Sequence, residues 1–126
     1  MLAPIPSVLL TSKAVFHLPV SMDDYQKPVY EDIEVSHVHI QNGNQLKPSA
    51  QNEQYTLKAI LFVDGRRSTP NLDYMSLMAA SEAVGAAMTV RVIEPSGVEA
   101  NYTIEYVDAL PDVPTTRVHH YEIGLV

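Results

Sequence analysis

The sequence of 126 residues contains no cysteine and no tryptophan, and it has only five glycines. Without cysteine there is no disulfide framework, no thiolate metal cluster and no cysteine nucleophile. The fold must therefore be held together by a hydrophobic core, and a chain of this length buries about two-thirds of the surface that it exposes when unfolded. We expect a single domain over residues 1–126 that folds in an intracellular compartment.

Basic residues are also scarce, with eight Lys and Arg against 15 Asp and Glu and a formal net charge of −7. This excess of acid repels a phosphate backbone, and the only adjacent basic residues are Arg66 and Arg67, so general nucleic-acid binding is disfavoured. Long apolar runs are missing too. Residues 77–87 are interrupted by polar side chains and are shorter than the roughly 20 residues of a membrane span. The N-terminus has no basic region before its apolar residues and predicts no secretion signal.

Alternation of apolar and polar side chains predicts strands in the first half of the chain. Residues 12–18 alternate with one exception, Val15, which is typical of a half-buried strand. Residues 32–40 alternate as well, but the apolar positions change phase near Ser36 and His37. Because one extra residue moves all following side chains to the other face, this slip predicts a β-bulge.

The middle of the chain combines a polar segment, an apolar segment and a turn. Residues 41–54 are almost entirely polar and include Pro48, which predicts a long, mobile loop. Residues 55–63 become continuously apolar from Ala59, as in a central strand buried on both faces. Residues 64–68 predict a turn in which Gly65 has a positive φ.

The second half of the chain predicts one uncertain segment and three strands. Residues 71–87 have helical spacing with Asn71 as the cap, and the alternative is an extended apolar loop. Two alternating runs, 88–92 and 102–106, flank Pro95 and Gly97 and predict a hairpin, and a last strand covers 117–125. The chain is therefore predicted to be mainly β: a small antiparallel barrel or sandwich of about six strands, with a long loop and at most one short helix.

Motifs with defined chemistry are absent from the sequence. The glycines are scattered singly, so no nucleotide cofactor is implied. His37 and His39 lie two residues apart and His119 and His120 are adjacent, but no cysteine or carboxylate completes a ligand set on the same strand. Ser68 has no nucleophile motif around it. We expect no metal, no cofactor and no enzymatic activity.

Two motifs carry a resemblance to a known family. The first is the strand and turn of residues 57–70, which reads LKAILFVDGRRSTP, and the second is Tyr102-Thr-Ile104 followed by the C-terminal residues 118–126. Together they resemble the minor capsid proteins of tailed bacteriophages that infect Gram-positive bacteria, among the head-closure (stopper) components of the head-tail connector. The sequence departs from that family in residues 71–87, which are unusually rich in Ala and Met.

The resemblance implies a small β-barrel that forms a homo-oligomeric ring below the portal and its adaptor. Such a ring closes the DNA channel without gripping the DNA specifically, and receives a tail completion or tail terminator protein below it. It implies a place in the virion neck, assembly in the host cytoplasm and no membrane partner. The alternatives are the adaptor itself, or a free barrel that binds a small ligand or peptide through residues 72–88.

Under this reading, the side chains of interest are those of turns, polar segments and apolar surfaces. The candidates for subunit interfaces are Asp64, Arg66, Arg67, Ser68, Asn42, Gln45, Met75, Met78, His119 and His120. The candidates for acidic groups that face the channel and repel DNA are Asp23, Asp24 and Glu53.

Overall fold

The computed structural model describes residues 7–48, 54–70, 72–111 and 118–126. A short 3-10 helix, η1 (Ser7–Leu9), precedes the first strand. The other elements follow in the order β1 (Ser12–Met22), β2 (Pro28–Pro48), β3 (Gln54–Asp64), α1 (Tyr74–Val84), β4 (Thr89–Ile93), β5 (Glu99–Pro111) and β6 (Val118–Leu125). None of the described helices is long and apolar enough to cross a membrane.

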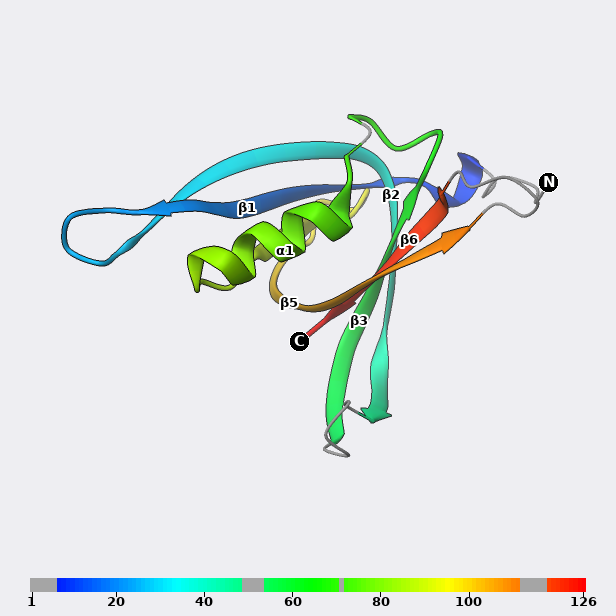
Figure 1. Ribbon diagram of the computed structural model, residues 1–126. Coiled ribbons are helices and arrows are strands. Elements are labelled where there is room, and N and C mark those ends of the chain that lie inside the picture. The colour runs from blue at the N-terminus through cyan, green and yellow to red at the C-terminus, as the bar shows by residue number, and fades with distance from the viewer. Residues whose placement is uncertain (1–6, 49–53, 71, 112–117) are drawn as a thin grey trace.

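The six strands form a closed antiparallel barrel with the order β1-β2-β3-β6-β5-β4 (Figure 1). The barrel closes where Lys13 to His17 of β1 pair with Ile93 to Thr89 of β4. Alternate side chains point inward, and those of Phe16, Leu61 and Ile123 are fully buried. The interior is therefore a packed hydrophobic core. The mainly β prediction, with six strands, is confirmed.

The β-bulge predicted near Ser36 and His37 is present. Ser12 pairs with Val38 but Lys13 pairs with Ser36, so His37 is the extra residue, and it has a φ of 63°. Because of this extra residue, Val35 and Val38 both point into the core and are both fully buried. The bulge lets one long strand present apolar side chains inward on both sides of the phase change.

The predicted central strand is β3, which lies between β2 and β6. Its burial differs from the prediction of two covered faces. Ala59, Leu61 and Val63 lie in the core, whereas Ile60 and Phe62 are only half-buried on the outside of the barrel. The continuous apolar run therefore marks a strand with one packed face and one partly covered face.

Two hairpins extend beyond the barrel as arms, and both use β2 (Figure 1). In the β1–β2 arm, residues 18–22 pair with residues 28–31 after the pairing of β1 with β4 has ended at His17. In the β2–β3 arm, residues 42–48 pair with residues 54–59, and the pairing with β6 begins only at Ala59.

The β2–β3 arm corrects the prediction of a loop over residues 41–54. The backbone pairs regularly up to Pro48 and Gln54, with one irregularity between Asn42 and Gln45, and residues 49–53 lie outside the described part. A two-stranded ladder outside the core needs backbone hydrogen bonds but no apolar side chains, so polar composition does not exclude a strand. Pro48 occupies the end of the strand, where a missing N–H group matters least.

The uncertain segment contains the helix α1, and the alternative of an extended apolar loop is wrong over Tyr74–Val84. Its N-cap is Asp73, whose carboxylate accepts a hydrogen bond from the Ser76 backbone N–H at 3.2 Å, and not Asn71, which lies outside the described residues. Gly85 ends the helix with a φ of 85°.

The buried face of α1 is not the one that the helical spacing of Leu72, Met75, Met78 or Ala79, Glu82 and Ala83 indicates, although Leu72 and Met78 are half-buried against the core. Tyr74 and Ser81 are buried instead, whereas Met75 and Glu82 are exposed. The Tyr74 ring packs between Phe16 and Tyr121, with ring centroids 5.1 and 5.0 Å away. This aromatic contact fixes the rotation of the helix, which lies against β1 and β5 (Figure 1).

The predicted hairpin and last strand are also present. β4 pairs with β5, and the turn between Ile93 and Glu99 contains Gly97 with a φ of 89°. β5 continues through Pro111, beyond the predicted end of that strand. β6 begins at Val118, and the predicted first residue, Arg117, lies outside the described residues.

Candidate contact surfaces

The 64–68 turn is built by two buried polar side chains. The Asp64 carboxylate accepts hydrogen bonds from the backbone N–H groups of Arg66 and Arg67 at 3.0 and 2.6 Å. The Ser68 hydroxyl accepts one from the Asp64 N–H at 2.9 Å and donates one to the carbonyl of His37. Asp64 and Ser68, which were predicted as interface residues, are 2% and 1% exposed, and their side chains point inward and shape the turn. Arg66 and Arg67 are exposed.

Gly65 is required in this turn, but not for the predicted reason. The positive-φ glycines of the described residues are Gly85 and Gly97. At Gly65, a Cβ atom would lie 2.2 Å from the carbonyl oxygen of Val118, and the Gly65 N–H donates to the carbonyl of His119 at 2.9 Å. The close approach of β6 therefore leaves no room for a side chain.

Residues 57–70 therefore form one structural unit. After the turn, Thr69 exchanges two backbone hydrogen bonds with Ser36, at 2.7 and 3.1 Å. The turn thus ties the end of β3 to the bulge of β2 on one side and to the start of β6 on the other.

Beside the turn lies a shallow apolar pocket of about 240 Å³. It is lined by Leu9, His39, Gln41, Phe62 and His120. The Phe62 ring packs between His39 and His120, with centroids 5.8 and 6.2 Å away. His120 pairs with Asp64 in the ladder between β3 and β6, so the pocket and the turn are contiguous.

The adjacent histidines, His119 and His120, lie at the start of β6 and contact each other. Nδ1 of His119 lies 2.7 Å from Nδ1 of His120, and Nε2 of His120 lies 3.5 Å from a Glu122 carboxylate oxygen. His37 is the bulge residue and is exposed. Among the residues that the structure describes, no three metal-binding side chains come together.

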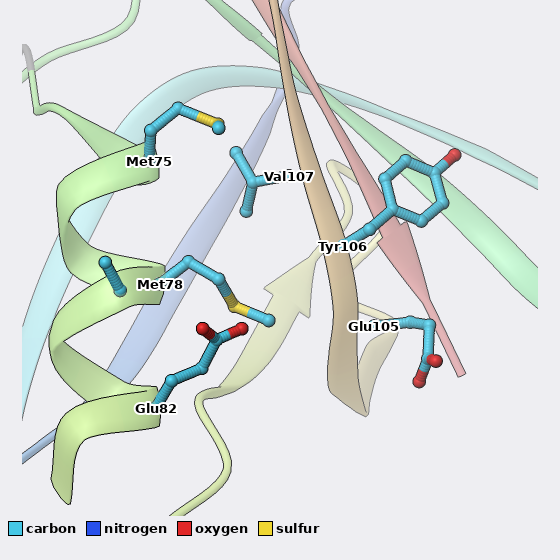
Figure 2. A pocket seen from close by; sticks show the side chains of 7 residues that line it. Met75, Met78, Glu82, Glu105, Tyr106 and Val107 are labelled. Atoms are coloured by element: carbon cyan, nitrogen blue, oxygen red, sulfur yellow. The ribbon is translucent and has the colours of Figure 1, made fainter. Parts of the chain in front are cut away.

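A second groove, of about 320 Å³, lies between α1 and β5. Figure 2 shows Met75 and Met78 extending from the helix toward Val107, with the carboxylates of Glu82 and Glu105 contributed by opposite sides. The sequence predicted the two methionines, but not Glu82, Glu105 or the β5 residues. The β5 residues of the groove gave a weak signal in the sequence, because Glu105 is an extra residue in β5 between Ile104, which pairs with Leu125, and Tyr106, which pairs with Gly124.

The tip of the β1–β2 arm was missed almost completely by sequence reasoning. Five of the nine exposed large hydrophobic side chains in the described part of the chain lie on this arm: Val20, Met22, Tyr25, Val29 and Tyr30. Tyr25 is 83% exposed. Only Asp23 and Asp24 were predicted here, as acids facing a channel, because two adjacent carboxylates dominate the local pattern.

The remaining candidates are on the β2–β3 arm. Asn42 is exposed, and its side-chain oxygen accepts a hydrogen bond from the Tyr102 hydroxyl at 3.3 Å. For Gln45 the structure describes the backbone, which pairs with Leu57. Glu53 lies outside the described residues.

In the described part of the chain, the ionisable groups with shifted pKa values lie in α1, at its N-cap or next to it. Burial raises the pKa of the Tyr74 hydroxyl well above its usual value. Burial also raises the pKa of Tyr121, and the nearby Asp73 carboxylate adds to this effect. Both phenols are therefore neutral over the physiological range and act as packing groups. Hydrogen bonds from the Ser76 side chain and backbone lower the pKa of Asp73.

These features define a small barrel with a packed interior, whose binding capacity lies in its turns, arms and grooves. A family model described as minor capsid protein matches residues 6–125, and the chain belongs to this family. It is thus a structural component of a bacteriophage virion. Comparison with curated proteins and with solved structures found no match.

Proposed function

We propose that this minor capsid protein is the head-closure, or stopper, protein of the head-tail connector. Several copies form a ring below the portal and its adaptor, in the neck of the virion. The ring retains the packaged DNA and receives the tail completion or terminator protein. The observation that carries the proposal is the β2–β3 arm, a two-stranded projection that leaves a closed, rigid barrel (Figure 1).

The β2–β3 arm suits a channel better than the other arm does. Its residues 41–54 are almost entirely polar, so they tolerate a water-filled channel with DNA in it. The β1–β2 arm instead exposes a cluster of apolar side chains, which favours a protein contact. The two arms leave the barrel in different directions (Figure 1), and we assign the polar one, including Gln45 and Glu53, to the channel.

The acidic balance supports a channel that holds DNA without binding it tightly. The net charge of −7 of the whole chain disfavours adhesion to phosphates, and residues 41–54 contain one lysine and one glutamate, so the obstructing arm adds no net positive charge that would hold the DNA that it blocks. Retention is then mechanical, and the arm can be displaced when the DNA leaves. A ring of this kind needs no catalytic centre.

The direct test is to package DNA into heads that lack this protein. Such heads are expected to fill and then to lose their DNA, and to fail to attach tails. Electron microscopy of purified heads, with nuclease sensitivity of their DNA, measures both outcomes. Heads that keep their DNA and become infectious on addition of tails would exclude a stopper function.

Two alternative functions are an adaptor under the portal and a module that binds a small ligand or peptide. An adaptor is disfavoured because such proteins are helical, whereas the described part of this chain has one α-helix. A ligand- or peptide-binding module is favoured only by the α1–β5 groove, which is lined by Met75 and Met78 together with Glu82 and Glu105. A purified chain that ignores portal-adaptor complexes and instead binds a peptide in this groove would support the module.

A further inference from the structure

The tip of the β1–β2 arm is an exposed apolar surface on a rigid support. Val20, Met22, Tyr25, Val29 and Tyr30 are all at least partly uncovered within eleven residues of sequence. Monomeric soluble proteins rarely concentrate their exposed apolar side chains in this way, and such patches usually mark binding sites.

The tip is also preorganised. The Asp23 carboxylate accepts hydrogen bonds from the backbone N–H groups of Tyr25 and Lys27, at 2.9 and 2.8 Å. Backbone bonds between Asp23 and Lys27 and between Gln26 and Asp23 close the same turn. A rigid tip loses little conformational entropy on binding, which favours its use as a docking element.

The charge of the arm restricts its partner. Residues 18–31, which form the arm, contain three acidic side chains and one lysine. A partner surface should therefore combine an apolar recess with basic groups, since like charges at an interface are costly.

The opposite side of the same molecule offers this combination. Arg66 and Arg67 are exposed on the 64–68 turn, and the apolar pocket around Phe62 lies next to them. Figure 1 shows the tip of the β1–β2 arm and the end of β3, where this turn begins, on opposite sides of the barrel. One surface of the molecule is thus acidic and protruding, and the other is basic and recessed.

We propose that the β1–β2 arm of one copy docks on the 64–68 turn and the Phe62 pocket of the next copy. In this contact Tyr25 enters the pocket, while Asp24 and Glu31 face Arg66 and Arg67. Because the two surfaces differ and lie on opposite sides, the contact is head-to-tail and adds copies in one direction, which closes into a ring when the rotation allows it. This contact joins neighbouring copies in the proposed stopper ring. Only the closure of the copies into a ring rests on the proposed function, and the contact between two copies does not.

Two variants that each lose one surface test the contact. The arm variant carries Asp24→Lys and Tyr25→Ser, and the turn variant carries Arg66→Glu and Arg67→Glu. All four side chains are exposed, and the backbone N–H groups of the two arginines, which substitution retains, donate to Asp64, so both variants should fold. The matched control carries Val98→Ser and Glu99→Lys on the exposed β4–β5 hairpin.

Sedimentation velocity over a range of concentrations measures the result. The wild-type chain and the control should associate with rising concentration, and each variant alone should remain monomeric. A mixture of the two variants should form dimers and nothing larger, because one variant retains the arm and the other retains the turn. A mixture that stays monomeric, a wild-type chain that never associates, or variants that assemble normally would each overturn the proposal.

Disulfide trapping tests the same contact in assembled particles and independently of affinity. The chain has no cysteine, so Tyr25→Cys with Arg66→Cys introduces a single pair. Oxidation should give a covalent ladder of copies, whereas Val98→Cys with Arg66→Cys should not. The absence of a ladder, or ladders of equal extent in the two variants, would contradict the docking but would leave the stopper proposal intact. Heads that retain their DNA without the protein would contradict the stopper proposal but would leave the docking intact.

Discussion

The two arms of this protein are built from the same strand, β2, yet they have opposite surface chemistry. The β1–β2 arm is acidic, exposes five large apolar side chains and ends in a hydrogen-bonded turn. The β2–β3 arm is polar in sequence over residues 41–54. A small barrel can therefore present two kinds of surface by extending one strand beyond its core at both ends. We propose that the first arm holds a neighbouring subunit and that the second stands in the channel.

The largest effects are expected at the roots of the arms, where both join the core. Leu18 on the first arm and Leu57 on the second are buried. Leu18→Ala and Leu57→Ala should each lower the free energy of unfolding by about 2–5 kcal/mol, because each removes a buried side chain and leaves a cavity. Urea unfolding followed by circular dichroism measures this loss.

A substitution at the tip of the β1–β2 arm should lower the free energy of unfolding much less than a substitution at the root of either arm. Tyr25→Ser should change the free energy of unfolding by less than about 0.5 kcal/mol, since the side chain is largely exposed. A tip substitution that destabilises the chain as much as a root substitution would show that the arms are part of the core, and would remove the distinction between support and contact.

An intermediate effect is expected for the turn at the tip of the β1–β2 arm. Asp23→Ala removes the acceptor of two backbone hydrogen bonds and should cost roughly 1 kcal/mol, with a loosened tip. Asp23→Asn retains a side-chain oxygen that can accept these hydrogen bonds, so this variant should lose less stability than Asp23→Ala. Hydrogen exchange of the Tyr25 and Lys27 amides reports the change, and unaltered exchange in the alanine variant would contradict a preorganised tip.

A smaller effect, on the pH dependence of stability, is expected at the N-cap of α1, the helix that packs against β1. Hydrogen bonds from Ser76 lower the pKa of Asp73 in the folded state, so its stabilising effect is present above the unfolded pKa and is lost as pH falls through the folded value. Asp73→Asn should keep the cap but remove this contribution to the pH dependence of the melting temperature.

Asp73→Ala should loosen the two arms unequally. Because α1 supports β1 and not the β2–β3 arm, amide exchange should rise in residues 18–22 and stay unchanged in residues 54–58. Equal changes in both arms would show that they are not independently supported.

The sequence predicts the barrel well because its strands bury one face. Alternation located the bulge at His37 and the β4–β5 hairpin, since a single face must remain inward along each strand. The β2–β3 arm was not predicted, because a ladder outside the core leaves no apolar period in the sequence. The rotation of α1 was missed for another reason: Tyr74 is held by Phe16 and Tyr121, which are distant in the sequence.

The candidate surfaces were predicted unevenly, also for physical reasons. Arg66 and Arg67 were identified because adjacent charges stand out in a sequence with few basic residues. Asp64 and Ser68 belong to the same motif, but their hydrogen bonds direct them inward. The apolar tip escaped notice because exposed Val, Met and Tyr look like core residues until the strands are known to extend beyond the barrel.

The proposed role of the polar β2–β3 arm in retaining DNA is tested most directly by shortening this arm. Replacing residues 46–56 by Asn-Gly keeps the backbone pair of Gln45 and Leu57 and supplies a two-residue turn that suits a hairpin. Heads carrying this variant should contain the normal amount of the protein yet lose their packaged DNA, as measured by the ratio of full to empty heads in electron micrographs. Heads that contain the shortened protein and remain full would contradict the account.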